Sequence, residues 1–280
     1  MLGKFGRMIG VSRPVFWLIA PAAYLFGAIS SGSAITQAAL FQAFLLSFPL
    51  GVYVFGINDL FDTETDGANP RRRGWLWGAK VVKEDASWIY PSSLMVAAAM
   101  LASSANPIQA LVIAIFLPIP LIYSMPPLRL KSRPVLDSIS NAAYTYGPYA
   151  MGFSMSGGLG FLNPQMILFA LVFSAAHAIG TVMDMEGDRR AGIRTFAIAY
   201  GPRAAALFAT AVLLANLPFL WGAMKSMFAV ILVYLLSSLW VLLRPGPEAA
   251  KSAFLAMNIA LAAWMAYAFC GYASGLWEAA

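Results

Sequence analysis

The sequence predicts an all-α integral membrane protein, and three observations lead to that class. First, 60% of the 280 residues are hydrophobic and only 11% are charged, with a mean hydropathy of +0.73, whereas soluble domains carry about 25% charged residues. Second, apolar runs long enough to cross about 30 Å of hydrocarbon as a helix recur along the chain. Third, basic residues collect on one side of those runs. We therefore expect one transmembrane domain over residues 1–280, surrounded by lipid.

The apolar runs number nine, and each predicts a transmembrane helix. They cover residues 15–31, 37–57, 88–104, 108–123, 136–156, 165–183, 204–222, 227–243 and 253–273. Prolines at positions 91, 118, 120 and 148 interrupt the third, fourth and fifth runs and are expected to bend them. The first run can also be interpreted as a signal peptide, but the eight runs after it and its charge pattern favour a span.

The distribution of basic residues predicts the orientation. If the nine runs alternate across the membrane, one side carries every Lys and Arg of the chain except Lys225. By the positive-inside rule the N-terminus is then cytoplasmic and the C-terminus external, in the cell membrane. Basic cytoplasmic loops account for the net charge of +6, so the charge calls for no nucleic-acid partner.

The acidic residues form two clusters at cytoplasmic ends of apolar runs. Asp59, Asp62 and Asp66 follow the second run, and Asp184 and Asp188 follow the sixth, which places five of the seven aspartates in two groups. Steps of three and four residues put each group on one face of a helix. Carboxylates there repel one another and meet the negative end of the helix dipole. Bound cations are therefore expected.

Magnesium is the cation that fits these ligands best. Oxygen ligands without Cys or His suit Mg²⁺, which combines carboxylates with the oxygens of a substrate phosphate. Arginines trail both clusters and can neutralise the remaining phosphate charge. We interpret the clusters as a Mg²⁺-bridged diphosphate site at the cytoplasmic mouth of a helical bundle. The alternative is a pair of solvated polar loops beside the membrane.

Three stretches carry a resemblance to a known family. "NDLFDTETD" has the form Asn-Asp-x-x-Asp-x-x-x-Asp, and "DMEGDRRAGIRT" has Asp-x-x-x-Asp followed by Gly and Thr. "YSMPPLRLKSRP" places a Tyr before a Pro-rich basic stretch, in the predicted cytoplasmic loop after the fourth run. With nine predicted spans, the chain resembles the UbiA superfamily of intramembrane prenyltransferases over essentially its whole length.

The resemblance implies a nine-helix UbiA-type bundle with a central cavity, in which Mg²⁺ binds the diphosphate of an isoprenyl donor. Its metal ligands would be Asp59, Asp62, Asp66, Asp184 and Asp188. Its diphosphate contacts would be Asn58, Arg71, Arg72, Lys131, Arg189 and Arg194. Catalytic roles would fall to Asp62, Asp184 and Tyr123.

The implied chemistry is ionisation of an allylic C–O bond and capture of the carbocation by an electron-rich acceptor. Aromatic faces can stabilise such a cation, and Tyr123, Tyr144, Tyr146 and Tyr149 are candidates. The alternative is core packing or a place in the aromatic belt at the membrane interface. His177, the only histidine, can act as a base or as a buried structural residue.

Two residues of the fifth run are also open to two interpretations. Asp137 and Asn141 lie one helical turn apart. They can orient a loop or a metal-bound water, or they can cap and pack the local backbone.

The acceptor is predicted to be a carotenoid. "SRPVFW", "DGANPRRRG", "RPVLDSISN" and "GDRRAGIRTFA" look most like the lycopene elongase branch, which implies dimethylallyl diphosphate as donor and a lycopene end as the hydrophobic acceptor. Asn69-Pro70-Arg71 replaces the Asn-Arg-Pro stretch frequent in the family and weakens assignment to its quinone branches. Prenylation of a quinone precursor such as 4-hydroxybenzoate or a naphthoate is the alternative.

A membrane transporter is the alternative from another class. Transporters place ionisable residues near the bilayer midplane at broken helices. Both acidic clusters here are predicted at one face of the membrane, which favours the enzyme.

Overall fold

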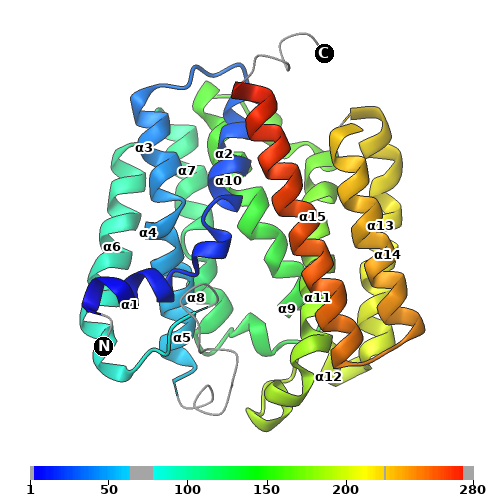
Figure 1. Cartoon of the computed structure of the whole chain (residues 1–280). Helices are drawn as coiled ribbons and strands as arrows, with labels where there is room; N and C mark the ends of the chain where they lie inside the picture. Colours follow the sequence, from blue (N-terminus) through cyan, green and yellow to red (C-terminus); the bar gives the residue numbers. More distant parts are fainter. Residues whose placement is uncertain (1–2, 64–77, 224, 274–280) are drawn as a thin grey trace. The chain divides into compact units, whose positions relative to one another are not determined.

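The computed structural model describes residues 3–63, 78–223 and 225–273 (Figure 1). These residues form helices joined by turns and short loops, and no strand occurs among them. They divide into two compact units, of which the first is Met1–Lys131 with Ala142–Ile167 and the second is Ser132–Asn141 with Leu168–Ala280.

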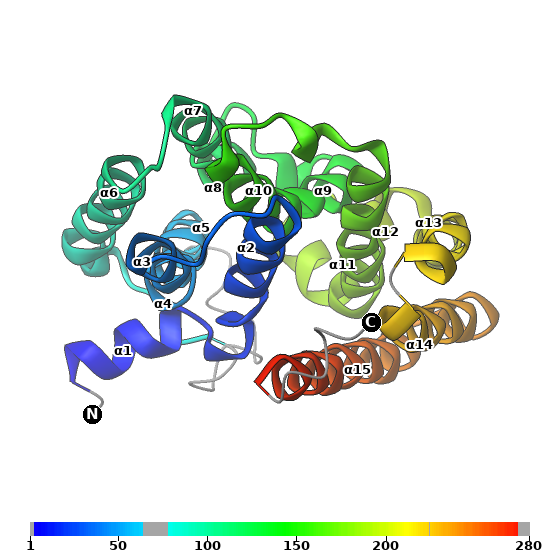
Figure 2. The ribbon, with the colours of Figure 1, turned by 90° about the horizontal axis from the view of Figure 1, so that it is seen from above.

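The first unit holds the N-terminal helices and the helix after residue 142. Its α-helices are α1 (Lys4–Val11), α2 (Ile19–Ser30), α3 (Gln37–Leu45), α4 (Phe48–Gly51), α5 (Ile57–Phe61), α6 (Ala86–Ala102), α7 (Pro107–Phe116), α8 (Ile119–Ser124) and α10 (Ala143–Phe153). Its other helical segments are η1 (Pro14–Phe16), η2 (Val52–Gly56), η4 (Lys83–Asp85), η5 (Leu130–Ser132), η7 (Ser154–Ser156) and η8 (Gly160–Leu162). Figure 2 shows α2 beside α10.

These two helices approach closely because glycine faces backbone. A Cβ on Gly27 would lie 2.1 Å from the carbonyl oxygen of Tyr149, and one on Gly152 would lie 1.9 Å from that of Tyr24. No other residue type fits either position without separating the helices. Small residues serve helix contacts in membranes in this way, because lipid supplies no hydrophobic force that brings apolar helices together.

The second unit holds most of the C-terminal half. Its helices are α9 (Leu136–Ile139), α11 (Pro164–Arg190, which begins in the first unit), α12 (Phe196–Tyr200), α13 (Pro202–Ala223), α14 (Lys225–Leu243) and α15 (Pro247–Ala273), with η6 (Ser140–Ala142) at its edge. Its core is rich in alanine, including Ala175, Ala178, Ala205, Ala206 and Ala209. A hydrogen bond of 2.9 Å between the hydroxyls of Thr210 and Ser238 joins α13 to α14.

Helix occurs in every one of the nine predicted runs. Within the described residues, five helical stretches are long and apolar enough to cross a membrane: Gln37–Phe61, Pro107–Ser124, Pro164–Arg190, Ser226–Leu243 and Pro247–Ala268. A sixth arises if the pair Lys4–Val11 and Pro14–Ser30, bent by 49°, counts as one span. The chain is therefore a multi-pass membrane protein. Nine spans, one domain and the orientation stay predictions.

The second run departs from the regular helix that was predicted. The stretch Gln37–Phe61 includes a π-helical segment, η2, and its last helix, α5, ends at Phe61. Asp62 and Thr63 form a turn, so the prediction that the first acidic cluster continues along one helical face is wrong at Asp62. Asp66 lies outside the described residues, as do Arg71 and Arg72.

Candidate active site

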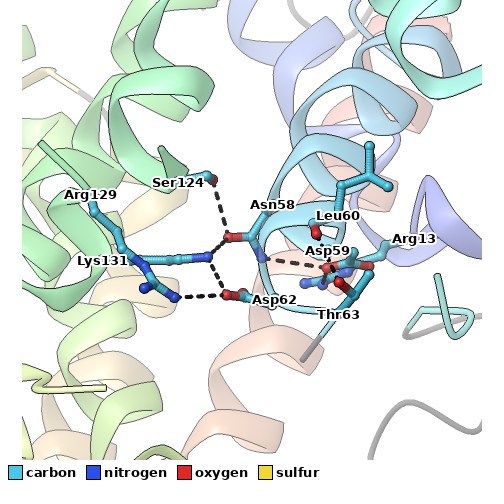
Figure 3. Close-up of polar contacts among 9 residues, drawn as sticks. All are labelled: Arg13, Asn58, Asp59, Leu60, Asp62, Thr63, Ser124, Arg129 and Lys131. Carbon is cyan, nitrogen blue, oxygen red and sulfur yellow. Dashed lines mark hydrogen bonds and ion pairs between the residues drawn. The ribbon is translucent and has the colours of Figure 1, made fainter. Parts of the chain in front are cut away.

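A buried lysine lies against the first acidic motif (Figure 3). The Lys131 ammonium donates to Oδ1 of Asp62 at 2.6 Å and to Oδ1 of Asn58 at 3.0 Å. Asp62 is 4% exposed and Lys131 6% exposed. Burying these two charges together is tolerable, whereas removing either partner would leave the other as an uncompensated buried charge. The sequence predicted both as site residues, and the structure brings them into contact.

Two further donors from the segment after α7 face the same oxygens. The Ser124 hydroxyl donates to Oδ1 of Asn58 at 3.2 Å. Nη2 of Arg129 lies 3.4 Å from Oδ1 of Asp62, and Arg129 has a positive φ of 37°. Sequence reasoning missed both residues, although Arg129 lies inside the quoted stretch "YSMPPLRLKSRP". Donors therefore converge on the oxygens of this motif from the end of α8 and from the segment that follows it up to η5.

Asp59 contacts a different cation. Its Oδ1 accepts from Nη2 of Arg13 at 2.9 Å and from Nδ2 of Asn58 at 3.4 Å. The carboxylate is fully buried, whereas the Arg13 side chain is 19% exposed. Arg13 was not predicted to belong to the site. The available signal was an arginine directly before a proline in "SRPVFW".

The second acidic motif lies on the last turns of α11. That helix continues to Arg190, beyond the predicted span end at 183, so the helical spacing predicted for Asp184 and Asp188 is confirmed. Both aspartates are half-buried, and Arg189 and Arg194 are exposed. Glu186, which lies between the two aspartates, forms an exposed ion pair with Arg190 at 3.6 Å.

The candidate tyrosines pack against other aromatic rings. The ring of Tyr123, on α8, meets that of Tyr144 edge-on, with centroids 6.3 Å apart. The Tyr146 hydroxyl donates to the Phe161 carbonyl at 2.7 Å, and Tyr149 packs against Phe153 with centroids 6.0 Å apart. These contacts favour packing roles for Tyr146 and Tyr149. They leave Tyr123 and Tyr144 as a pair of aromatic faces near the motif-bearing helix.

Asp137 and His177 have structural contacts within the second unit. The Asp137 carboxylate accepts from the backbone amides of Ser138 at 2.8 Å and Phe196 at 2.7 Å. Asn141 donates to the Asp137 carbonyl at 2.7 Å. The first and third bonds cap the local backbone, and the bond to Phe196 orients the segment that begins α12. His177, which is half-buried, has its Nδ1 3.3 Å from the Ser138 hydroxyl.

An apolar hollow in the first unit begins one helical turn from Asn58. Val54, four residues before Asn58 in the same helical stretch, lines it. Its other walls are Leu46, Leu50, Tyr53, Met100, Phe116, Leu117, Ile119, Pro120, Ala143, Tyr144, Pro148 and Met151. The Tyr53 hydroxyl, the polar group of one wall, donates to the Leu117 carbonyl at 2.5 Å. The hollow therefore presents hydrocarbon and aromatic surface beside a polar site.

The donor atoms of the two motifs fit a hard divalent cation. Among the described residues no three acidic, His or Cys side chains lie together as a metal-binding group, and Asp66 lies outside them. The oxygens of Asn58, Asp62, Asp184 and Asp188 are ligands of the kind that Mg²⁺ takes in preference to softer metals. The cations beside Asp62 suit the diphosphate that commonly accompanies that metal.

The comparisons with known proteins agree with this picture. The model of the UbiA prenyltransferase family matches residues 17–262. A lycopene elongase/hydratase of Haloferax volcanii is 33% identical over 204 residues, which are 69% of this chain and 64% of that protein. A lycopene elongase/hydratase of Halobacterium salinarum is 35% identical over 210 residues, 70% of this chain and 72% of that protein. The match thus spans somewhat less than two thirds of the first relative's length.

A solved structure extends the likeness to the fold. The UbiA homologue of Archaeoglobus fulgidus bound to DMAPP and Mg²⁺ superposes with a TM-score of 0.69 at 22% identity, covering 94% of this chain and 98% of that one. At this identity the likeness concerns the fold alone. Because the family model reaches from the first apolar run into the last helix, the chain belongs to the UbiA prenyltransferase family.

Proposed function

We propose that the protein transfers a dimethylallyl group from its diphosphate to the end of lycopene or a related carotenoid, at a Mg²⁺-dependent site on the cytoplasmic side of the cell membrane. The observation that carries the proposal is the buried contact of Lys131 with Asn58 and Asp62. A chain so poor in charge does not bury an ammonium against a carboxylate without a use for both.

The donor site follows from the two motifs. Asn58, Asp62, Asp184 and Asp188 would hold the metal, together with Asp66 from outside the described residues. Bound Mg²⁺ supplies neutralisation of the leaving diphosphate. Lys131 and Arg129 supply positive charge from this chain, and Arg71, Arg72, Arg189 and Arg194 stay proposed diphosphate contacts. The Archaeoglobus fulgidus homologue, whose structure holds DMAPP and Mg²⁺, supports this donor.

The apolar hollow provides the second half of the reaction environment. Its position one turn from Asn58 would let a short prenyl group extend among hydrocarbon and aromatic side chains while its diphosphate stays with Lys131. Exclusion of water there protects an allylic cation from hydrolysis, and the faces of Tyr123 and Tyr144 would stabilise it. Asp59 stays a predicted metal ligand at this point, although it contacts Arg13.

The acceptor is proposed from the relatives and from the polarity of the chain. Two relatives matched over about 70% of this chain are named lycopene elongase/hydratase. An uncharged polyene needs few polar partners, in agreement with the apolar walls of the hollow. An aromatic quinone precursor would instead require a cation beside its carboxylate.

The test is expression in cells that accumulate lycopene, with Asp62→Asn as the inactive control. We expect carotenoids that are one or two five-carbon units heavier than lycopene, detected by mass spectrometry, and none with the control. Unchanged pigment, together with prenylation of a labelled aromatic acid by the same membranes, would move the assignment to the quinone branch.

A further inference from the structure

Arg13 has an unusual backbone conformation. It lies in the turn between α1 and η1 with φ 51° and ψ 78°, directly before Pro14. A non-glycine residue in the left-handed region is strained, and such strain persists only where the surroundings hold it. The contacts of the Arg13 side chain therefore account for the persistence of this backbone conformation.

The guanidinium of Arg13 is held by two partners on the motif-bearing helix. Its Nη2 donates to Oδ1 of Asp59 at 2.9 Å, and its Cζ lies over the Phe55 ring, 4.4 Å from the ring centroid. Phe55 and Asp59 are four residues apart and so lie on one face. A stacked, bidentate-capable guanidinium is far less mobile than an ammonium on a flexible stem.

The turn that carries Arg13 is itself fixed to the rest of the first unit. A Cβ on Gly51 would lie 2.5 Å from the carbonyl oxygen of Ser12, so only glycine lets the turn approach the helix this closely. Within α1, Arg7 pairs with Asp85, whose carboxylate also accepts from the backbone amide of Val82 at 3.0 Å. Arg13 therefore approaches Asp59 from a rigid support.

The two described aspartates of the first motif thus have different partners. Asp62 meets Lys131, a long chain that can move from the carboxylate to a phosphate, and Arg129 at 3.4 Å. Asp59 has a side chain of 0% exposure beside a stacked arginine. Separating that pair would leave a buried charge without compensation, so exchange of Arg13 for a metal ion is disfavoured (Figure 3).

We propose that Arg13 is a positioning residue, and that its ion pair with Asp59 fixes α5, the helix in which the motif begins, and aims Asn58 and Asp62 at the diphosphate and its metal. Asp59 is then a support and not a metal ligand, which differs from the role the sequence predicts for it. The inference deepens the proposed function and rests on it.

The test uses five variants: Arg13→Gln, Asp59→Asn, the double variant Arg13→Gln/Asp59→Asn, Arg13→Lys, and Asp62→Asn as the reference for a lost ligand. Each is measured in detergent for melting temperature and for Mn²⁺ binding by electron paramagnetic resonance in the presence of inorganic pyrophosphate. KM for dimethylallyl diphosphate and kcat are measured where activity remains.

We expect both single variants to melt below the wild type and the double variant to melt above the less stable of them, because a neutral pair leaves no buried charge. Its Mn²⁺ affinity should stay within about threefold of the wild type, while Asp62→Asn loses at least about tenfold. Arg13→Lys should keep the Mn²⁺ affinity and lose mainly kcat, because an ammonium replaces the charge without the planar stacking.

Two results would overturn the inference. Mn²⁺ binding by the double variant as weak as that of Asp62→Asn would make Asp59 a ligand. Additive losses of melting temperature would show that Arg13 and Asp59 are not coupled. If the single variants do not fold, the double variant and Arg13→Lys decide alone, and failure of either to fold counts against the inference. Failure of the proposed function is distinguishable, since the wild type itself would then bind no Mn²⁺ with pyrophosphate.

Discussion

The helical stretch Gln37–Phe61 carries a polar cluster at each end, and the two clusters differ in kind. On α3, Oε1 of Gln42 accepts from the Tyr24 hydroxyl at 2.6 Å and from Nε2 of Gln109 at 2.9 Å. Nε2 of Gln42 in turn donates to the Ser103 carbonyl at 2.8 Å. On α5, at the other end of the stretch in Figure 1, the partners of Asn58 and Asp62 include Lys131.

The difference between the clusters separates structure from function. The glutamine cluster is neutral, and amide and hydroxyl groups of the protein satisfy it, so it ties helices together without needing a ligand. The aspartate cluster is ionic, and its partner Lys131, in η5, has a long side chain that can move from the carboxylate to a phosphate. A protein that had only to bury polar groups would build the first kind at both ends.

The largest effect on catalysis is expected for Asp62→Asn, which replaces the carboxylate of the ionic cluster with a neutral amide. Prenyl transfer should fall at least about a hundredfold, because charge that stabilises the leaving group is lost, while the amide oxygen still accepts from Lys131. Turnover of dimethylallyl diphosphate by purified protein measures this. Asp184→Asn should behave alike, whereas Glu186→Gln, on the exposed side of the same helix, is the matched control. Near-normal turnover of Asp62→Asn or Asp184→Asn would contradict the proposed diphosphate site.

A smaller effect is expected for Lys131→Met, which removes the cation but keeps the length of the side chain. KM for the donor should rise about tenfold, since a hydrogen bond to a charged group is worth about 1.5–3 kcal/mol. Mn²⁺ affinity without diphosphate should rise, because the ammonium no longer competes for Asp62. Lys251→Met, which removes an exposed lysine paired with Glu248, should change neither quantity. A fall in Mn²⁺ affinity would contradict the exchange of cations.

The smallest effect on catalysis is expected for Gln109→Leu in the neutral cluster. Loss of a buried partner of Gln42 should lower the free energy of unfolding by about 1–3 kcal/mol and leave KM and Mn²⁺ affinity unchanged. Thermal melting and donor kinetics on the same preparation separate the two quantities. Gln37→Leu, at an exposed position in the first turn of α3, controls for the substitution. A changed KM in Gln109→Leu would contradict the separation of the two clusters, because it would show that the neutral cluster also affects donor binding.

The helical ranges and the motif residues could be predicted from the sequence because apolar length and residue spacing are local properties. Contacts over long sequence separations could not. Lys131 was predicted from its stretch, but its contact with Asp62 depends on how the chain returns between α5 and η5. Arg13 was counted only as a basic residue, since nothing local distinguishes an arginine that enters a core from one in a loop.

The neutral cluster was missed for a different reason. Gln42 and Gln109 are uncharged and lie in separate apolar runs. A search for acidic and basic residues does not detect them. Two glutamines in otherwise apolar segments are nevertheless a signal of hydrogen bonding between helices. The end of α5 at Phe61 was missed because the steps of three and four residues between the aspartates are also the spacing of a continuing helix.

The π-helical segment η2 (Val52–Gly56) bears on how this protein can be compared with others. A π-helical turn accommodates one extra residue, and one residue added to an α-helix rotates everything beyond it by about 100°. A helical wheel with 3.6 residues per turn drawn from α3 therefore does not give the face on which Asn58 lies. If a related sequence lacks the extra residue, an alignment without a gap in η2 pairs the motif residues correctly but shifts every residue before η2 by one position. Substitutions in α3 should therefore be planned independently of those in α5.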